Sequence, residues 1–218
     1  AFAALPEGTV DALLAGTDAL TNVLLYHVLG SEAFAADVVE LDGQKVQSLQ
    51  GQYLDITLDG ETVLVDEAMV IITDIDASNG VIHVIDAVLI PESRTIAEIA
   101  SESEDFSTLV AALQAADLVD ALNSEGEFTV FAPTDEAFAA LPDGTVDALL
   151  ADTDALTNVL LYHVLGSEAY AADVVELDGQ KVETLQGQYL DIALDGESVF
   201  VDESMVIITD IEASNGVI

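Results

Sequence analysis

The sequence predicts an α+β protein in which a unit of 136 residues is repeated in tandem. Residues 1–82 align without a gap with residues 137–218 and differ at ten positions, whereas residues 83–136 occur once. Within a unit, apolar residues first recur with a helical period and later alternate as in a strand. Because helices come first and strands follow, the order favours an α+β domain over an alternating βαβ sheet.

The first elements of the unit follow the polar joint at residues 91–94. Thr95-Ile-Ala-Glu98 has the form of a capping box and predicts a short helix over 95–100. Apolar spacing predicts helices over 107–116 and 117–122. Phe128–Pro133 reads as a short strand that the proline ends.

The clearest helix is predicted over Asp154–Leu165, after short helices at 138–141 and 146–150. Gly166 stands where a C-terminal glycine belongs. The residues at helical spacing form one apolar face: Leu156, Val159, Leu160, His163 and Val164.

Strands are predicted in the second half of the unit, most clearly in its first copy. Residues 53–59 alternate, and Asp59-Gly60 is typical of a hairpin turn. Residues 69–75 and 80–90 are apolar enough to be buried strands. We therefore expect residues 1–91 to be the C-terminal part of one domain, and residues 92–218 to be a second domain that lacks its last strand.

Composition excludes several classes of protein. A hydrophobic content of 51% excludes a disordered acidic tail. The net charge of −39 argues against nucleic acid and anionic membrane surfaces as partners, and no apolar run is long enough for membrane insertion. Without cysteine there is no disulfide, thiolate zinc site or cysteine nucleophile. No nucleophile elbow or glycine-rich phosphate loop is present, so we expect no enzyme activity.

Two long motifs resemble the conserved boxes of the fasciclin domain. Phe128-Thr-Val-Phe-Ala-Pro-Thr-Asp-Glu-Ala-Phe138 is similar to the first box, and Asn79-Gly-Val-Ile-His-Val-Ile-Asp-Ala-Val-Leu-Ile-Pro91 to the second. Between them, Tyr26-His27 and Tyr162-His163 resemble the family's tyrosine–histidine motif. The resemblance implies a wedge-shaped β-sandwich with flanking helices. It also implies an extracellular protein, often built of tandem domains, that takes part in cell adhesion and matrix binding.

The histidines of this motif allow two interpretations. His27 and His163 lie on an apolar helix face, where a histidine is commonly a core residue with its hydrogen bonds satisfied. The resemblance implies instead that Tyr26, His27, Tyr162 and His163 form an adhesion motif. His83, between Ile82 and Val84, is expected to be a hydrogen-bonded core residue.

Calcium is the one cofactor that the sequence leaves open. Asp74–Gly80 is only partly similar to an EF-hand loop, because its glycine stands at the seventh position and no glutamate stands at the twelfth. Acidic groups near the joint are the remaining candidate ligands: Glu92, Glu98, Glu102, Glu104 and Asp105. The acidic surface itself fits either a salty setting or recruitment of divalent cations.

These observations predict an extracellular adhesive or structural protein that forms a linear surface assembly or filament. Its expected partners are neighbouring copies of the repeat and cell-surface or matrix components. The alternative is an acidic calcium-binding module whose cation load controls assembly. The missing strand is expected to come from a covalently following unit, or else from a neighbouring chain.

Overall fold

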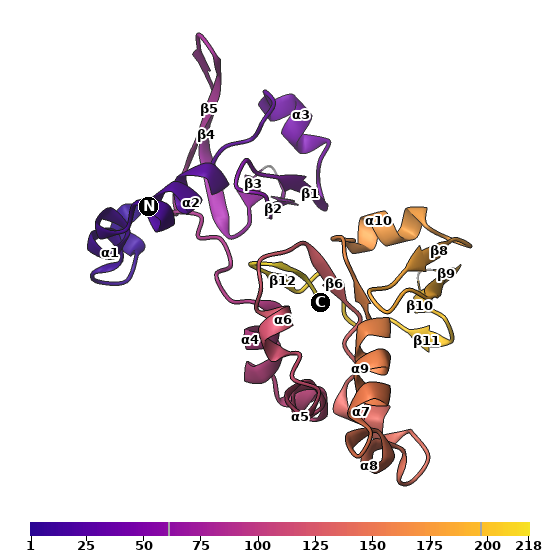
Figure 1. Cartoon of the computed structure of the whole chain (residues 1–218). Coiled ribbons are helices and arrows are strands. Elements are labelled where there is room, and N and C mark those ends of the chain that lie inside the picture. Colours follow the sequence, from indigo (N-terminus) through magenta and orange to yellow (C-terminus); the bar gives the residue numbers. More distant parts are fainter. Residues whose placement is uncertain (61, 197) are drawn as a thin grey trace. The chain divides into compact units, whose positions relative to one another are not determined.

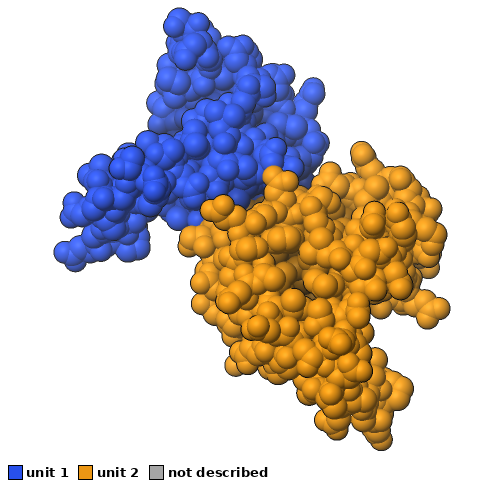
Figure 2. Space-filling model, in the orientation of Figure 1, with its two compact units in different colours: residues 1–91 blue, residues 92–218 orange. Residues whose placement is uncertain are grey.

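The computed structural model describes residues 1–60, 62–196 and 198–218. These residues form two compact units, unit 1 at 1–91 and unit 2 at 92–218 (Figure 2). Each unit contains helices and β-sheet, so the α+β class predicted from the sequence is confirmed.

Unit 1 is one antiparallel sheet with short helices before it (Figure 1). The helices are η1 (Phe2–Ala4), α1 (Thr9–Ala15), α2 (Thr17–Tyr26) and α3 (Ala35–Val39). The sheet has the order β1 (Gln44–Gln47), β2 (Tyr53–Asp59), β3 (Thr62–Val65), β4 (Ala68–Ala77) and β5 (Gly80–Ile85). The β4–β5 hairpin projects away from the rest of the unit (Figure 1). A small core holds Tyr26, Leu54, Ala68 and Leu89.

Unit 2 contains more helices and two sheets (Figure 1). Its helices are α4 (Ile96–Glu102), η2 (Glu104–Phe106), α5 (Ser107–Ala115), α6 (Val119–Leu122), α7 (Asp135–Ala139), α8 (Thr145–Leu150), α9 (Thr153–Tyr162) and α10 (Ala171–Glu176). One sheet has the order β11 (Ser204–Met205), β10 (Ser198–Val201), β9 (Tyr189–Asp195) and β8 (Lys181–Glu183). The other has the order β12 (Glu212–Ala213), β13 (Gly216–Val217), β6 (Phe128–Val130) and β7 (Val164–Leu165).

Local signals in the sequence are confirmed by the backbone. The Thr95 hydroxyl accepts a hydrogen bond from the Glu98 N–H at 3.3 Å, and the Glu98 carboxylate accepts one from the Thr95 N–H at 2.9 Å, which completes the capping box of α4. Gly60 has a φ of 66° at the hairpin turn, and Asp59 pairs with Thr62 across the hairpin. Glycine is favoured at this turn because it adopts positive φ without steric cost.

One helix and one strand end earlier in the structure than the sequence predicts. The helix expected over Asp154–Leu165 ends at Tyr162, and His163 caps it. Val164 and Leu165 instead pair with Val130 and Thr129 of β6, partners far away in sequence that periodicity does not reveal. Gly166 is therefore not the helix terminus. The strand expected to reach residue 90 ends at Ile85, because Leu89 turns its backbone N–H to His27.

Unit 2 is held together by two apolar clusters. The larger cluster joins α4, α5 and α9 to the β6 sheet, and Ile96, Leu109, Leu156 and Leu160 are among its buried members. The smaller one places Leu165 and Val174 against residues of β9 and β10.

Candidate functional site

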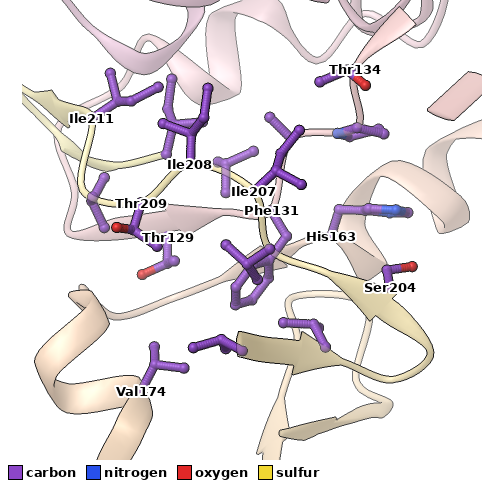
Figure 3. A pocket seen from close by; sticks show the side chains of 18 of the residues that line it. Thr129, Phe131, Thr134, His163, Val174, Ser204, Ile207, Ile208, Thr209 and Ile211 are labelled. Atoms are coloured by element: carbon purple, nitrogen blue, oxygen red, sulfur yellow. The ribbon is translucent and has the colours of Figure 1, made fainter. Parts of the chain in front are cut away.

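Unit 2 carries an open apolar groove with a volume of about 410 Å³, here called the unit 2 groove. Residues 129–134, which include β6 and the segment after it, line one side, and residues 204–211 line another. Phe131, His163 and the adjacent pair Ile207 and Ile208 lie around it, on three segments of the chain (Figure 3). Ile207 and Ile208 are 64% and 59% exposed, so the groove presents apolar surface to solvent.

The same amino-acid sequence has different backbone structures in the two units at this place. Residues 69–75 and 205–211 are both Met-Val-Ile-Ile-Thr-Asp-Ile. In unit 1 the whole segment belongs to β4, which pairs with β5. In unit 2, β11 ends at Met205 and β12 begins at Glu212, so the residues between them belong to no strand. The presence of a partner strand, rather than strand propensity, decides the conformation.

His27 joins α2 to the segment that follows β5. Its Nδ1 lies 2.7 Å from the Val23 carbonyl oxygen, and its Nε2 lies 3.0 Å from the Leu89 backbone nitrogen. Since the carbonyl can only accept and the N–H can only donate, the neutral ring carries its hydrogen on Nδ1 and accepts at Nε2. His27 thus holds the Leu89 segment against α2.

His163 is the counterpart of His27, but it lines the unit 2 groove. Its Nδ1 lies 2.8 Å from the Val159 carbonyl oxygen, which selects the same tautomer and leaves Nε2 as the acceptor. His83, the third histidine, donates from Nε2 to the Ala33 carbonyl at 2.7 Å and fits its expected hydrogen-bonding role.

The tyrosines of the motif anchor a helix to a sheet in each unit. The Tyr26 hydroxyl donates to the Tyr53 carbonyl and to Asp66, whose other carboxylate oxygen accepts from the Asp55 N–H. Burial raises the pKa of Asp66 above its ordinary value, although its hydrogen bonds oppose that rise. Tyr26 is buried, so its side chain serves packing within unit 1.

The corresponding phenol in unit 2 makes the same contacts. The Tyr162 hydroxyl lies 3.2 Å from the Tyr189 carbonyl and 2.9 Å from Asp202. Burial and the hydrogen bond to the Asp202 carboxylate raise the pKa of Tyr162. The Asp202 carboxylate also accepts from the Asp191 N–H at 2.8 Å. In both motifs the tyrosine fixes the helix end that presents the neighbouring histidine.

Asn215, the counterpart of Asn79 at the start of the second box, joins distant parts of unit 2. This buried side chain accepts a hydrogen bond from the Ile96 N–H at 2.9 Å and donates to the carbonyls of Leu122 and Ser124 at 2.7 and 2.9 Å. It therefore connects the start of α4 and the end of α6 to the β12–β13 hairpin. A side chain at the next residue, Gly216, would come within 2.0 Å of the Phe128 carbonyl oxygen, so only glycine fits beside β6.

The first box has a similar structural role. The Asp135 carboxylate accepts hydrogen bonds from the Ser107 hydroxyl and from the Thr108 N–H at the start of α5. These donors lower the pKa of Asp135, because they favour its charged form. The Thr134 hydroxyl caps α7 by accepting from the Ala137 N–H at 3.3 Å. These hydrogen bonds of the first box thus hold in place the segment after β6, which lines one side of the groove.

The five acidic residues predicted as calcium ligands take part in different interactions. Arg94 pairs with Glu92 and, at 2.8 Å, with Glu102. The hydrogen bonds from Arg94 lower the pKa of Glu92 to about 2. Glu98 caps α4, Glu104 begins η2, and Asp105 lines the unit 2 groove. Within the described ranges, no three His, Cys, Asp or Glu side chains form a group that could hold a metal ion.

Comparison with known proteins places both units in one family. Residues 1–91 and 104–218 match the fasciclin domain. The chain belongs to the fasciclin domain family. The fasciclin resemblance expected from the two boxes and the tyrosine–histidine motif is therefore confirmed.

Fasciclin relatives occur in bacteria and animals. The chain is 49% identical over 128 residues to Protein sll1483 of Synechocystis, which covers 58% of this chain and 69% of that protein. It is 33% identical over 197 residues to transforming growth factor-beta-induced protein ig-h3 of Sus scrofa and 33% identical over 203 residues to human periostin. These two alignments cover 90% and 91% of this chain but only 28% and 24% of those proteins. The chain thus spans about a quarter of their length.

A solved FAS1 domain pair from the insect cell adhesion molecule fasciclin I also resembles this fasciclin chain. The two share 18% sequence identity with a TM-score of 0.48, and the match covers 96% of this chain and 81% of the insect chain. Over the residues that our structure describes, every helix is too short or too polar to cross a bilayer.

Sequence reasoning did not identify the groove, Asn215 or Asp135 as features of the fasciclin site. Asp135 lies inside the first box, and Asn215 is the counterpart of Asn79, the first residue of the second box, so these motifs were the available signal. The groove has no composition signal, because its Met-Val-Ile-Ile-Thr-Asp-Ile segment reads as an ordinary strand in both copies. The difference between the copies becomes visible only when their partners are compared.

Proposed function

We propose that this fasciclin chain is an extracellular adhesive or structural protein that binds neighbouring copies of itself and cell-surface or matrix components. Fasciclin domains are of an adhesion type and are not generally enzymatic, which supports an adhesive role. The observation that carries the proposal is the unit 2 groove, where Ile207 and Ile208 expose adjoining apolar surface. Apolar surface of this kind on a protein otherwise rich in carboxylates marks an interaction site.

The near-identity of the two copies supports assembly into a linear array. Equivalent units offer equivalent surfaces, and head-to-tail contacts between them propagate when the rotation does not close a ring. Acidic side chains elsewhere on the chain disfavour nonspecific association at low salt, because like charges repel.

A surface-binding assay tests the adhesive role. Cells and matrix-coated beads are presented to the immobilised chain, and retention under flow is compared with that on an acidic protein of equal charge. We expect retention on the chain, and we expect the double variant His27→Ala, His163→Ala to lose it if the motif is adhesive. Retention no greater than on the acidic control would contradict the adhesive function.

A further inference from the structure

We propose that Asn215-Gly216 is a deamidation site that the fold of unit 2 protects, and that opening of the unit allows conversion of the asparagine into aspartate or isoaspartate. The inference concerns a chemical modification of unit 2 and does not rest on the adhesive role proposed above. It follows from two constraints of the fold, one on each residue, and from the chemistry of the residue pair that they bring together.

The first constraint is on the side chain of residue 215, which is 4% exposed. Its amide oxygen accepts from the Ile96 N–H at 2.9 Å, and its amide nitrogen donates to the carbonyls of Leu122 and Ser124 at 2.7 and 2.9 Å. A short side chain that accepts at one end and donates twice at the other must be a carboxamide. The contacts of α4 and α6 therefore require an asparagine at this position.

The second constraint is on the backbone of residue 216. Gly216 pairs with Ala213 of β12 on one side and with Phe128 of β6 on the other. Its φ is 146°, and a Cβ atom here would come within 2.0 Å of the Phe128 carbonyl oxygen. Only glycine fits between the two strands. The two constraints are separate, and together they place asparagine directly before glycine.

Asparagine is a thermally labile residue, and a following glycine has no side chain to hinder the reaction. The Gly216 backbone nitrogen loses its proton and attacks Cγ of Asn215. A carbon–nitrogen bond forms, the bond from Cγ to Nδ2 breaks, and ammonia leaves. Water then opens the five-membered succinimide: attack at Cγ gives aspartate, and attack at the main-chain carbonyl gives isoaspartate. The conversion consumes one water, releases one ammonia and involves no oxidation or reduction.

The folded structure opposes the first step. Attack requires the carboxamide to turn toward the Gly216 nitrogen, which would break the three hydrogen bonds of the side chain. The main chain is held as well, because the Asn215 carbonyl accepts from the Phe128 N–H at 3.0 Å. Reaction therefore proceeds from states in which this part of unit 2 is open, and its rate follows their population.

Neither product fits the place that the asparagine leaves. An aspartate would direct a carboxylate oxygen at the carbonyl oxygens of Leu122 and Ser124, where Nδ2 now donates, and would bury its charge. An isoaspartate adds one carbon to the backbone and so displaces Gly216 from its close contact with β6. Conversion thus makes the opening of unit 2 irreversible, since the modified chain cannot restore these contacts.

The experiment incubates the 218-residue chain at pH 8 and 37 °C in water enriched in oxygen-18, with and without guanidinium chloride. Peptide mapping by mass spectrometry measures aspartate and isoaspartate at residue 215, and incorporation of the isotope shows that water opened a succinimide. Leu109→Ala loosens the core of unit 2 without changing Asn215. Asn215→Asp supplies one product directly, and its matched control is Asn158→Asp, which adds the same charge at an exposed position of unit 2.

We expect conversion to be at least tenfold slower in the folded chain than in guanidinium chloride, and at least tenfold faster in folded Leu109→Ala than in the unchanged chain. If Leu109→Ala does not fold, guanidinium concentrations just below the unfolding midpoint give the same comparison. Asn215→Asp should raise the unfolding equilibrium constant of unit 2 at least tenfold, against less than threefold for Asn158→Asp.

Each part of the inference has a result that would overturn it. Absence of conversion at residue 215 in guanidinium chloride would show that the pair is not a deamidation site. Equal rates in the folded and denatured chain would show that the fold does not protect it, and a rate that loosening does not change would exclude reaction through open states. An Asn215→Asp variant as stable as Asn158→Asp would show that the aspartate product fits the folded unit.

Discussion

The Nε2 atom of His27 accepts a hydrogen bond from the backbone N–H of Leu89 at 3.0 Å, across 62 residues of sequence. Leu89 is buried, so this N–H depends on the imidazole for a partner away from water. His163 has the same local environment on its helix, with Nδ1 at the Val159 carbonyl, yet it faces the unit 2 groove. The two equivalent histidines thus differ: His27 binds the Leu89 segment in unit 1, whereas His163 lines the groove in unit 2.

The first prediction separates these two histidines. We expect His27→Phe to lower the free energy of unfolding of unit 1 by about 1–3 kcal/mol, because the Leu89 N–H is left buried without its acceptor. His163→Phe should cost unit 2 less, since it removes only the contact with the Val159 carbonyl. Native-state hydrogen exchange resolved by peptide measures each unit separately. Equal losses in the two units would contradict the role assigned to the Leu89 hydrogen bond.

The second prediction concerns Asn215. We expect Asn215→Ala to destabilise unit 2 by roughly 2–4 kcal/mol, because it leaves the Ile96 N–H and two carbonyl oxygens without their partner. The matched control is Asn79→Ala, at an exposed position of unit 1, which should change stability by no more than about 0.5 kcal/mol. Thermal unfolding and hydrogen exchange of α4 report the effect. An equal loss of stability in the two variants would show that Asn215 does not stabilise unit 2 by joining α4 to the β12–β13 hairpin.

The repeat shows why only part of this structure could be predicted from sequence. The capping box at Thr95 and the turn at Gly60 depend on neighbours within four residues, and both were predictable. Burial was not. Leu24 and Leu160 are equivalent residues in identical helices, but Leu24 is 57% exposed and Leu160 is 5% exposed. Leu160 packs against α4 and α5, elements with no counterpart in residues 1–91.

The candidate site was beyond prediction for the same reason. Its residues are apolar in both copies, and a pattern of period two predicts a strand without saying whether a partner strand is bound. Only the structure distinguishes the paired 69–75 segment from the irregular 205–211 segment. The motif residues were recognisable individually, whereas their arrangement around an open groove follows from contacts far apart in sequence.

The third prediction is a pH dependence centred on Glu168. Burial raises the pKa of this carboxyl, and repulsion from Glu127 and Glu212 raises it further. A raised folded-state pKa means that the folded unit binds the proton more tightly than the unfolded chain does. Stability from this group is therefore present at low pH and is lost as pH rises through the folded-state pKa.

We accordingly expect Glu168→Gln to stabilise unit 2 at pH 7 by up to about 1 kcal/mol, a figure reduced for solvent screening because the group is only partly buried. The advantage should shrink as pH falls toward the ordinary value of 4.5, where both states become protonated. Chemical unfolding from pH 4 to pH 8 measures it, with Glu32→Gln in unit 1 as the control that lacks a counterpart of Glu127. A stabilisation that stays constant with pH would show that charge is not its cause.

The last prediction concerns salt and calcium, which the sequence left as alternatives. The chain has 42 acidic and three basic residues, and Lys45, Lys181 and Arg94 each pair with carboxylates. Most of the acidic charge is therefore balanced by solvent ions. Because the screening length falls from about 30 Å at 0.01 M to about 3 Å at 1 M salt, we expect the melting temperature to rise with NaCl.

Calorimetric melts with NaCl, with CaCl2 and with a chelator separate the two alternatives. General screening predicts the same rise for NaCl and KCl and no effect of the chelator. A calcium site predicts a rise at micromolar to millimolar CaCl2 that MgCl2 does not reproduce, and a drop on chelation even at 1 M NaCl, because only ions bound to the folded state stabilise by mass action. The carboxylates of Glu92 and Glu102 already pair with Arg94, so we expect the screening result. A calcium-specific rise that Glu104→Gln and Asp105→Asn abolish together would overturn that expectation and place the cation beside the groove.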